Sequence, residues 1–188
     1  MADLDAFTAL GADSARTLLR GTLTIEENPG LALASLALRR GAVRPTPFDL
    51  ALPAPGRWTG AGPVCAFWIA PDQWMIGADG QAESDFAAEL ATRCPGCSVT
   101  EQTDGFVAYE IRSSSGDASI IALLAKLVNI DPVELQAGRA LRTGLEHQSV
   151  YIIRRAADHL AILGMRSFAE ALWHALETAR SRIAVKQG

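Results

Sequence analysis

Apolar and polar positions along the chain repeat one pattern three times: a strand, a tight turn, a second strand and then a helix. The first repeat pairs residues 64–69 with residues 74–76, both rich in aromatic and β-branched side chains. A helix is expected next, at residues 81–93, because apolar side chains recur there at every fourth position. The side chains on its buried face are Phe86, Leu90 and Cys94.

The second repeat pairs residues 98–103 with residues 106–112. Asp104-Gly105 separates the two strands, and this dipeptide is a strong hairpin signal. A helix should follow the three serines at 113–115, whose hydroxyls can cap the free amides of its first turn. Its apolar stripe comprises Ile120, Leu123, Leu124 and Leu127.

The third repeat pairs residues 150–155 with residues 159–165. Its helix is expected to begin at Ser167, because Glu170 three positions later completes the spacing of a capping box. One face of this helix is apolar. It comprises Phe168, Leu172, Ala175, Leu176 and Ala179.

Outside the repeats, residues 31–38 predict another strand and residues 14–20 a short helix. Residues 39–63 hold five prolines, which lack the amide that a sheet requires, so this segment is expected to be an irregular arm. Residues 129–144 are interpreted as a connection with one turn of helix at 132–135. Antiparallel hairpins with helices on one face predict an α+β fold. Residues 1–63 and 64–188 are expected to pack as one compact domain.

Composition and net charge limit the classes of partner that the chain is expected to bind. The chain is 49% hydrophobic and 20% charged, against a usual charged share of about 25%. A charge-poor exterior leaves room for an apolar docking surface, although an excess of alanine explains the composition equally well. The net charge of −4 argues against nucleic acid and anionic lipid as partners.

The same sequence gives an expectation for the compartment. Its apolar runs are far shorter than the ~20 residues of a membrane span, and no signal peptide is visible at the start. Three cysteines are an odd number and form no disulfide framework. A reducing cytoplasm is therefore the expected compartment.

Cys94 and Cys97 form a C-x-x-C motif, which is found in redox dithiols and in zinc sites. Zinc needs two more ligands, but Cys65 and the three histidines are scattered along the chain. Cys94 ends a predicted helix, where the helix dipole disfavours a thiolate. We therefore interpret Pro95-Gly96 as a helix-stop turn and predict no metal site.

No catalytic residue is predicted, because the chain lacks a dinucleotide-binding loop, a Walker loop and a nucleophile elbow. Three arginines, Arg139, Arg142 and Arg166, could hold the two carboxylates of a folate tail through their planar guanidinium groups. Alternatively, they cover the surface or contact a partner.

Four segments resemble the gamma subunit of heterotetrameric sarcosine oxidase. Residues 68–76 (WIAPDQWMI) are similar to its L-G-P-D-E-W-L-L hairpin, and residues 123–132 to its "vLak…lDL" helix and turn. Residues 138–143 match the strand g-x-x-x-x-T, and residues 165–176 resemble the closing "RSfA…LW..L". The matches keep their order and spacing across residues 64–180.

This resemblance implies an aminomethyltransferase-like, folate-binding type of fold. It also implies assembly with alpha, beta and delta subunits into an enzyme that oxidises sarcosine. In that family the other chains hold FAD, FMN, NAD, zinc and tetrahydrofolate. The K-G-C-Y-x-G-Q-E tract of folate-binding relatives is absent, and residues 135–139 read LQAGR in its place. The resemblance therefore implies a chain with no cofactor of its own.

Three hypotheses follow. The first is a non-catalytic gamma subunit whose arm contacts its partners, since interfaces favour apolar and aromatic anchors. The residues expected to make this contact are Phe48, Leu50, Leu52 and Trp58. The second is a free-standing folate-binding or one-carbon-transfer protein that uses Arg139, Arg142 or Arg166. The third is a thiol oxidoreductase that uses Cys94 and Cys97.

Overall fold

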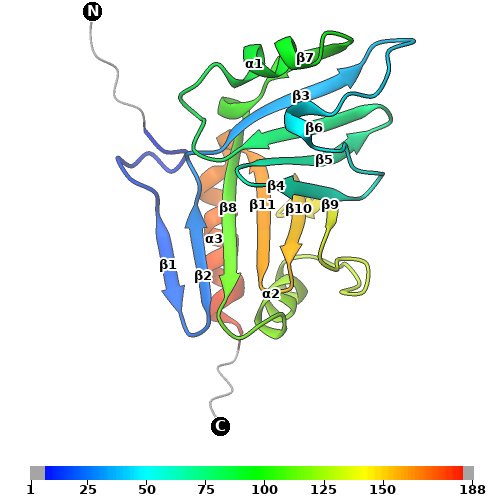
Figure 1. The fold of residues 1–188 in the computed structure, drawn as a ribbon. Helices are drawn as coiled ribbons and strands as arrows, with labels where there is room; N and C mark the ends of the chain where they lie inside the picture. The colour runs from blue at the N-terminus through cyan, green and yellow to red at the C-terminus, as the bar shows by residue number, and fades with distance from the viewer. Residues whose placement is uncertain (1–6, 184–188) are drawn as a thin grey trace, which may run out of the picture.

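The computed structural model describes residues 7–183, which form two antiparallel β-sheets and three α-helices (Figure 1). The six-stranded sheet contains, in spatial order, β1 (Thr17–Arg20), β2 (Leu23–Glu27), β8 (Phe106–Ser113), β11 (His159–Met165), β10 (Gln148–Ala156) and β9 (Arg139–Leu145). The five-stranded sheet contains β4 (Trp58–Ala61), β5 (Val64–Ala70), β6 (Gln73–Ala78), β3 (Ala32–Leu38) and β7 (Cys97–Glu101). The helices are α1 (Phe86–Arg93), α2 (Ala118–Leu127) and α3 (Ala169–Ser181).

The elements stack in layers, and the predicted α+β class is confirmed. One apolar cluster joins the inner faces of the two sheets, with Phe67 and Met75 on one side and Ile153 and Leu163 on the other. A second cluster packs α2 and α3 on the outer face of the six-stranded sheet. A third packs α1 on the outer face of the five-stranded sheet, which Figure 1 shows above β3.

Two of the three predicted hairpins are confirmed. β5 pairs with β6 and places Trp68 opposite Trp74, and Asp72 in their turn has a φ of 55°. β10 pairs with β11 and places Tyr151 opposite Leu163. The strand predicted at residues 31–38 is β3.

The predicted hairpin across Asp104-Gly105 is wrong. β7 pairs with β3 in the five-stranded sheet, whereas β8 pairs with β2 and β11 in the six-stranded sheet. A type I′ turn needs positive φ at both central residues, and neither Asp104 nor Gly105 has one. They belong instead to a short 3₁₀ helix, Thr103–Gly105, that carries the chain from one sheet to the other.

The helix predicted at residues 14–20 is also wrong. This segment contains β1, which forms a hairpin with β2 and pairs Arg20 with Leu23. Gly21 permits the tight turn between them, at a φ of 61°. The helix predicted at residues 81–93 begins later, at Phe86, because the Asp85 carboxylate accepts a hydrogen bond of 3.1 Å from the Ala88 amide.

Neither predicted serine cap forms. Asp117 occupies the position before α2, while Ser115 lies 3.1 Å from Ser119, hydroxyl to hydroxyl. A 3₁₀ turn, Arg166–Phe168, precedes α3, so Ser167 does not cap it. Glu170 does not complete a capping box, since its carboxylate forms an ion pair of 3.0 Å with Arg16.

The two segments expected to be irregular each contain regular structure. Within residues 39–63, a 3₁₀ turn (Pro47–Asp49) and the edge strand β4 form. Within residues 129–144, β9 begins at Arg139, which corrects the interpretation of that end as a connection. In the described part of residues 1–63, β1 and β2 join the six-stranded sheet, and β3 and β4 join the five-stranded sheet.

Candidate functional site

A cavity lined by several charged side chains lies between the two sheets and has a volume of about 430 Å³. Side chains from β4, β5, β8, β10 and β11 line it. Because β-strand side chains alternate, Arg155 points to this inter-sheet side together with Ile153, two positions before it. The cavity is therefore built from strands that are distant in sequence.

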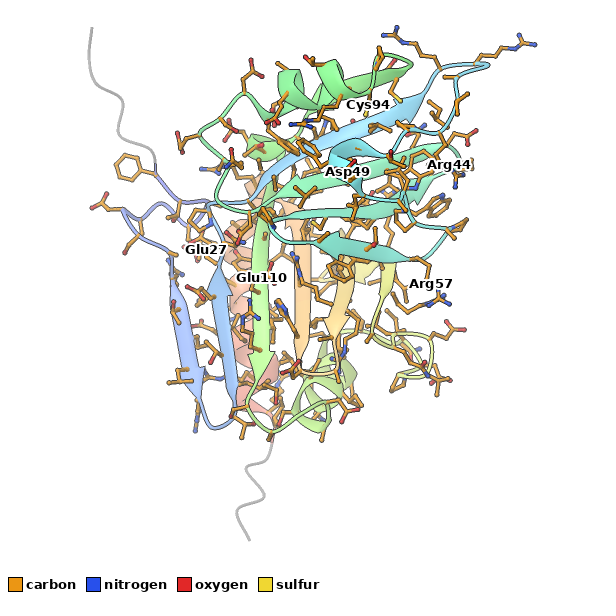
Figure 2. The ribbon with its side chains drawn as sticks, in the orientation of Figure 1. Glu27, Arg44, Asp49, Arg57, Cys94 and Glu110 are labelled. Carbon is orange, nitrogen blue, oxygen red and sulfur yellow. The ribbon has the colours of Figure 1, made fainter. Side chains whose placement is uncertain are left out.

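Glu110 on β8 is the centre of this cavity's polar network (Figure 2). Glu110 is only 8% exposed. One carboxylate oxygen accepts a hydrogen bond of 2.7 Å from Arg155 Nη2. The other lies 2.6 Å from His159 Nε2. This carboxylate thus joins three neighbouring strands, β8, β10 and β11, through one buried ion-pair network.

The hydrogen bonds also determine the tautomer of His159. Arg112 Nη1 lies 3.1 Å from His159 Nδ1, and a guanidinium can only donate. Nδ1 therefore accepts, and the proton lies on Nε2, from which it is donated to Glu110. Both ring nitrogens are engaged, so His159 has no free nitrogen with which to accept a proton from a substrate.

Charges around this cavity balance. Asp79 and Glu110 supply two negative charges, and Arg112 and Arg155 two positive ones. Asp79 accepts a hydrogen bond of 2.9 Å from Asn28. Burial raises the pKa of the Cys65 thiol, although the nearby Arg155 opposes the shift, so the thiol stays protonated at neutral pH. The arrangement favours cross-linking of strands over nucleophilic or acid–base chemistry.

A second cavity, of about 370 Å³, lies beside the loop that precedes β1. Glu27, which Figure 2 labels, lines it and is 2% exposed. Its carboxylate accepts hydrogen bonds from the amides of Leu10, at 3.1 Å, and Arg16, at 3.4 Å. Glu27 therefore holds the loop onto β2.

The three predicted folate-binding arginines do not form one site. Arg139 Nε donates to the Glu134 carbonyl at 3.0 Å, and Arg142 Nε donates to Ser149 Oγ at 2.7 Å. Because Arg139 and Arg142 are three positions apart on β9, their side chains point to opposite faces of the sheet. Arg166 lies at the second cavity, where Nη2 donates to the Phe7 carbonyl at 2.9 Å.

Cys94 and Cys97 lie in the core beneath α1 and are 1% and 6% exposed. The Cys94 amide closes the helix through a hydrogen bond of 3.0 Å to the Leu90 carbonyl. Burial raises the pKa of the Cys94 thiol to about 11, and the neighbouring Cys97 adds to the shift. Burial also raises the pKa of Cys97. The geometry favours the helix-stop interpretation of this motif.

We therefore expect both thiols to react slowly with iodoacetamide in the folded protein. Their raised pKa values keep both thiols protonated at neutral pH. The reactivity of Cys94 should rise only as the pH approaches the pKa of its thiol, about 11. Mass spectrometry of the alkylated protein should show fast labelling in concentrated urea alone. Ser84→Cys, at an exposed position, provides a fast-reacting control. Rapid labelling of the folded wild-type chain would contradict this expectation.

The predicted partner-contact residues separate into two groups. Leu50 and Leu52 are 5% and 7% exposed and belong to the chain's own core, so their side chains are not open to a partner. Phe48 and Trp58 are half-buried. Phe48 stacks on Phe86 on the α1 side, whereas Trp58 packs on the inter-sheet side. The two aromatic side chains thus lie on opposite faces of the five-stranded sheet.

The residues of the inter-sheet network were not among the predicted site residues. Glu110 in FVAYEIRS and Arg155 in QSVYIIRRA lie in strands whose central residues are largely apolar. A charge within an apolar strand requires a buried partner, and this was the available signal. Among residues 7–183, no group of three or more His, Cys, Asp or Glu side chains could hold a metal ion. No helix in that range is long and apolar enough to span a membrane.

Comparisons with known proteins identify the fold. No protein-family model matches the sequence, and no curated protein matches it. A chain of heterotetrameric sarcosine oxidase from Corynebacterium sp. U-96, solved with pyrrole 2-carboxylate, is similar in structure with a TM-score of 0.69 and 20% identity. The similarity covers 88% of this chain and 87% of that one.

A second similar structure is glycine cleavage system aminomethyltransferase T from Bartonella henselae. The TM-score is 0.59 at 19% identity, over 87% of this chain. This chain has the aminomethyltransferase-like fold. It spans about half of the aminomethyltransferase, since the match covers 50% of that protein. The fold implied by the resemblance is therefore confirmed.

Proposed function

We propose that this chain is a gamma-type, non-catalytic subunit of a heterotetrameric sarcosine oxidase, assembled with alpha, beta and delta subunits in the cytoplasm. The observation that carries the proposal is the extent of the two structural matches. The chain corresponds almost end to end to a chain of such an oxidase, but to only half of an aminomethyltransferase. The match to the oxidase chain also has the higher TM-score, 0.69 against 0.59 for the aminomethyltransferase.

The inter-sheet cavity supports a role without catalysis. Its charges balance within the chain, and both nitrogens of His159 are engaged by Arg112 and Glu110. Arg139, Arg142 and Arg166 each donate a hydrogen bond to a group of the chain itself, which supports the non-catalytic subunit over a folate-binding protein. We therefore assign FAD, FMN, NAD, zinc and tetrahydrofolate to the partner chains in this proposal.

A strained turn in the arm supports a docking role. Phe48 and Asp49, of which Figure 2 labels Asp49, both have positive φ, of 53° and 61°, although neither is glycine. Such a conformation costs about 1–3 kcal/mol per residue and is concentrated at functional sites. The Phe48 ring is held between Phe86, with ring centroids 5.8 Å apart, and the Arg93 guanidinium, 4.4 Å from its centroid. This turn is the part of the arm that we propose to contact a partner.

Co-expression with the alpha, beta and delta chains encoded by the same genome tests the proposal. We expect a complex of fixed stoichiometry that produces peroxide from sarcosine. The isolated chain should be colourless and inactive. A bound flavin spectrum in the isolated chain, or an active complex formed without it, would contradict the proposal. A rise in its melting temperature with tetrahydrofolate would instead favour the free-standing folate-binding protein.

A further inference from the structure

Arg154 is a buried cation outside the inter-sheet network. It lies on β10 and is only 4% exposed. Because side chains alternate along the strand, it points to the helix-covered face of the sheet together with Ile152, whereas Arg155 points between the sheets. Arg154 therefore lies on the side of the sheet that α2 covers, at the end of the sheet where Figure 1 shows this helix.

The guanidinium of Arg154 lacks a full set of partners. Nη2 donates a hydrogen bond to the Ala157 carbonyl, but Nη1 is buried without any partner. None of the ion pairs found among residues 7–183 includes Arg154. Burial lowers its pKa, and Asp117 and Asp158 oppose this shift only from beyond ion-pair distance. An arginine side chain nevertheless stays charged at neutral pH.

A buried charge without a partner lowers the stability of the fold, and buried charges in proteins are usually paired. Glu110 neutralises Arg155 on the other face of the same strand. No carboxylate of the described chain does the same for Arg154. An anion would neutralise this charge, and a carboxylate matches the planar geometry of the guanidinium.

Arg154 also lines a cavity of about 170 Å³ between α2 and residues 128–135. The rest of the lining is mainly aliphatic, including Ile121, Leu124, Val128 and Ile130. An apolar cavity of about 150 Å³ is large enough to hold benzene. The space thus fits a ring or a short branched chain, with one charged group at its Arg154 end.

We propose that this cavity is a binding site for a small monocarboxylate with an apolar body. The carboxylate pairs with the guanidinium of Arg154, and the body packs against Leu124 and Val128. The site lies on the outer side of the six-stranded sheet, so it does not depend on the proposed subunit function. It uses none of the residues proposed to contact a partner.

Isothermal titration of the isolated chain with benzoate and with isovalerate tests the site. We expect saturable binding of at least one of these carboxylates and none of benzamide, which has the shape of benzoate without its charge. Arg154→Met keeps an unbranched, flexible side chain without the charge and should weaken binding by at least about 30-fold, the effect of removing one partner of a buried charge pair. Arg142→Met, at an arginine on the same sheet that does not line the cavity, should bind as the wild type does.

A second variant tests the apolar part of the site. Ala125→Leu, at an exposed position of α2 that lines the cavity, should fold normally and reduce binding by filling the space. Removal of a buried unpaired charge is not expected to unfold Arg154→Met, and its melting curve verifies this. Failure of both carboxylates to bind, equal binding of benzamide or chloride, or undiminished binding by Arg154→Met would overturn the proposal.

Discussion

Glu110→Ala is expected to lower the free energy of unfolding by about 3 kcal/mol, because it leaves two buried partners without their shared carboxylate. The side chains of Arg155 and His159 are 17% and 16% exposed, so water replaces the lost hydrogen bonds poorly. For a chain of this size, the melting temperature should fall by roughly 6–12 °C. Thermal unfolding followed by circular dichroism measures the change.

Two further variants make this test specific. Glu110→Gln keeps the size of the side chain and one acceptor oxygen, so its loss should be smaller than that of Glu110→Ala. Glu83→Ala removes a carboxylate at an exposed position and should change stability by less than about 0.5 kcal/mol. Equal melting temperatures for Glu110→Ala and Glu83→Ala would show that the network does not stabilise the fold.

The local order of apolar and polar residues was sufficient to predict much of this fold. The β5–β6 and β10–β11 hairpins were predicted because each joins two apolar strands through a short connection. The apolar faces of α2 and α3 were predicted from helical periodicity. In each of these cases, the residues that determine the structure are near neighbours in the chain.

Pairing between distant strands could not be predicted in the same way. β8 pairs with β2 and β11, which lie far from it in sequence, although Asp104-Gly105 favoured a hairpin with β7. β8 is buried over most of its length, whereas β7 is largely exposed. Placement of β8 inside the larger sheet buries more apolar surface than a local hairpin, and this outweighed the turn signal.

The partners of the buried charged residues could not be predicted from the sequence for the same reason. Glu110, Arg154 and Arg155 each come after a run of apolar residues within a strand, so the sequence marks them as unusual. Only the three-dimensional structure shows that Glu110 and Arg155 meet between the sheets, while Arg154 points the other way and lacks an ion-pair partner. Strand alternation separates two adjacent arginines into different environments. The partner of each depends on sheet order.

Phe48→Ala and Trp58→Ala, made separately, are expected to weaken assembly with the proposed partner subunits by about 2 kcal/mol each, or about 30-fold in affinity. Both side chains are only half-buried in the isolated chain, so part of each is accessible to a partner. Because they lie on opposite sides of the five-stranded sheet, an interface that includes both must extend around an edge of that sheet. Titration of each folded variant against the other subunits measures the loss.

Leu50→Ala and Leu52→Ala provide the matched control for this prediction. These residues belong to the same arm but are buried in the chain's own core, so truncation should lower the melting temperature and leave affinity of the folded protein unchanged. Phe48→Ala also removes the stacking on Phe86, and some loss of its own stability is therefore expected. The docking role requires a loss of affinity at a temperature where the variant is still folded. If Phe48→Ala and Trp58→Ala behave as the two leucine variants do, the arm stabilises the chain and does not contact a partner.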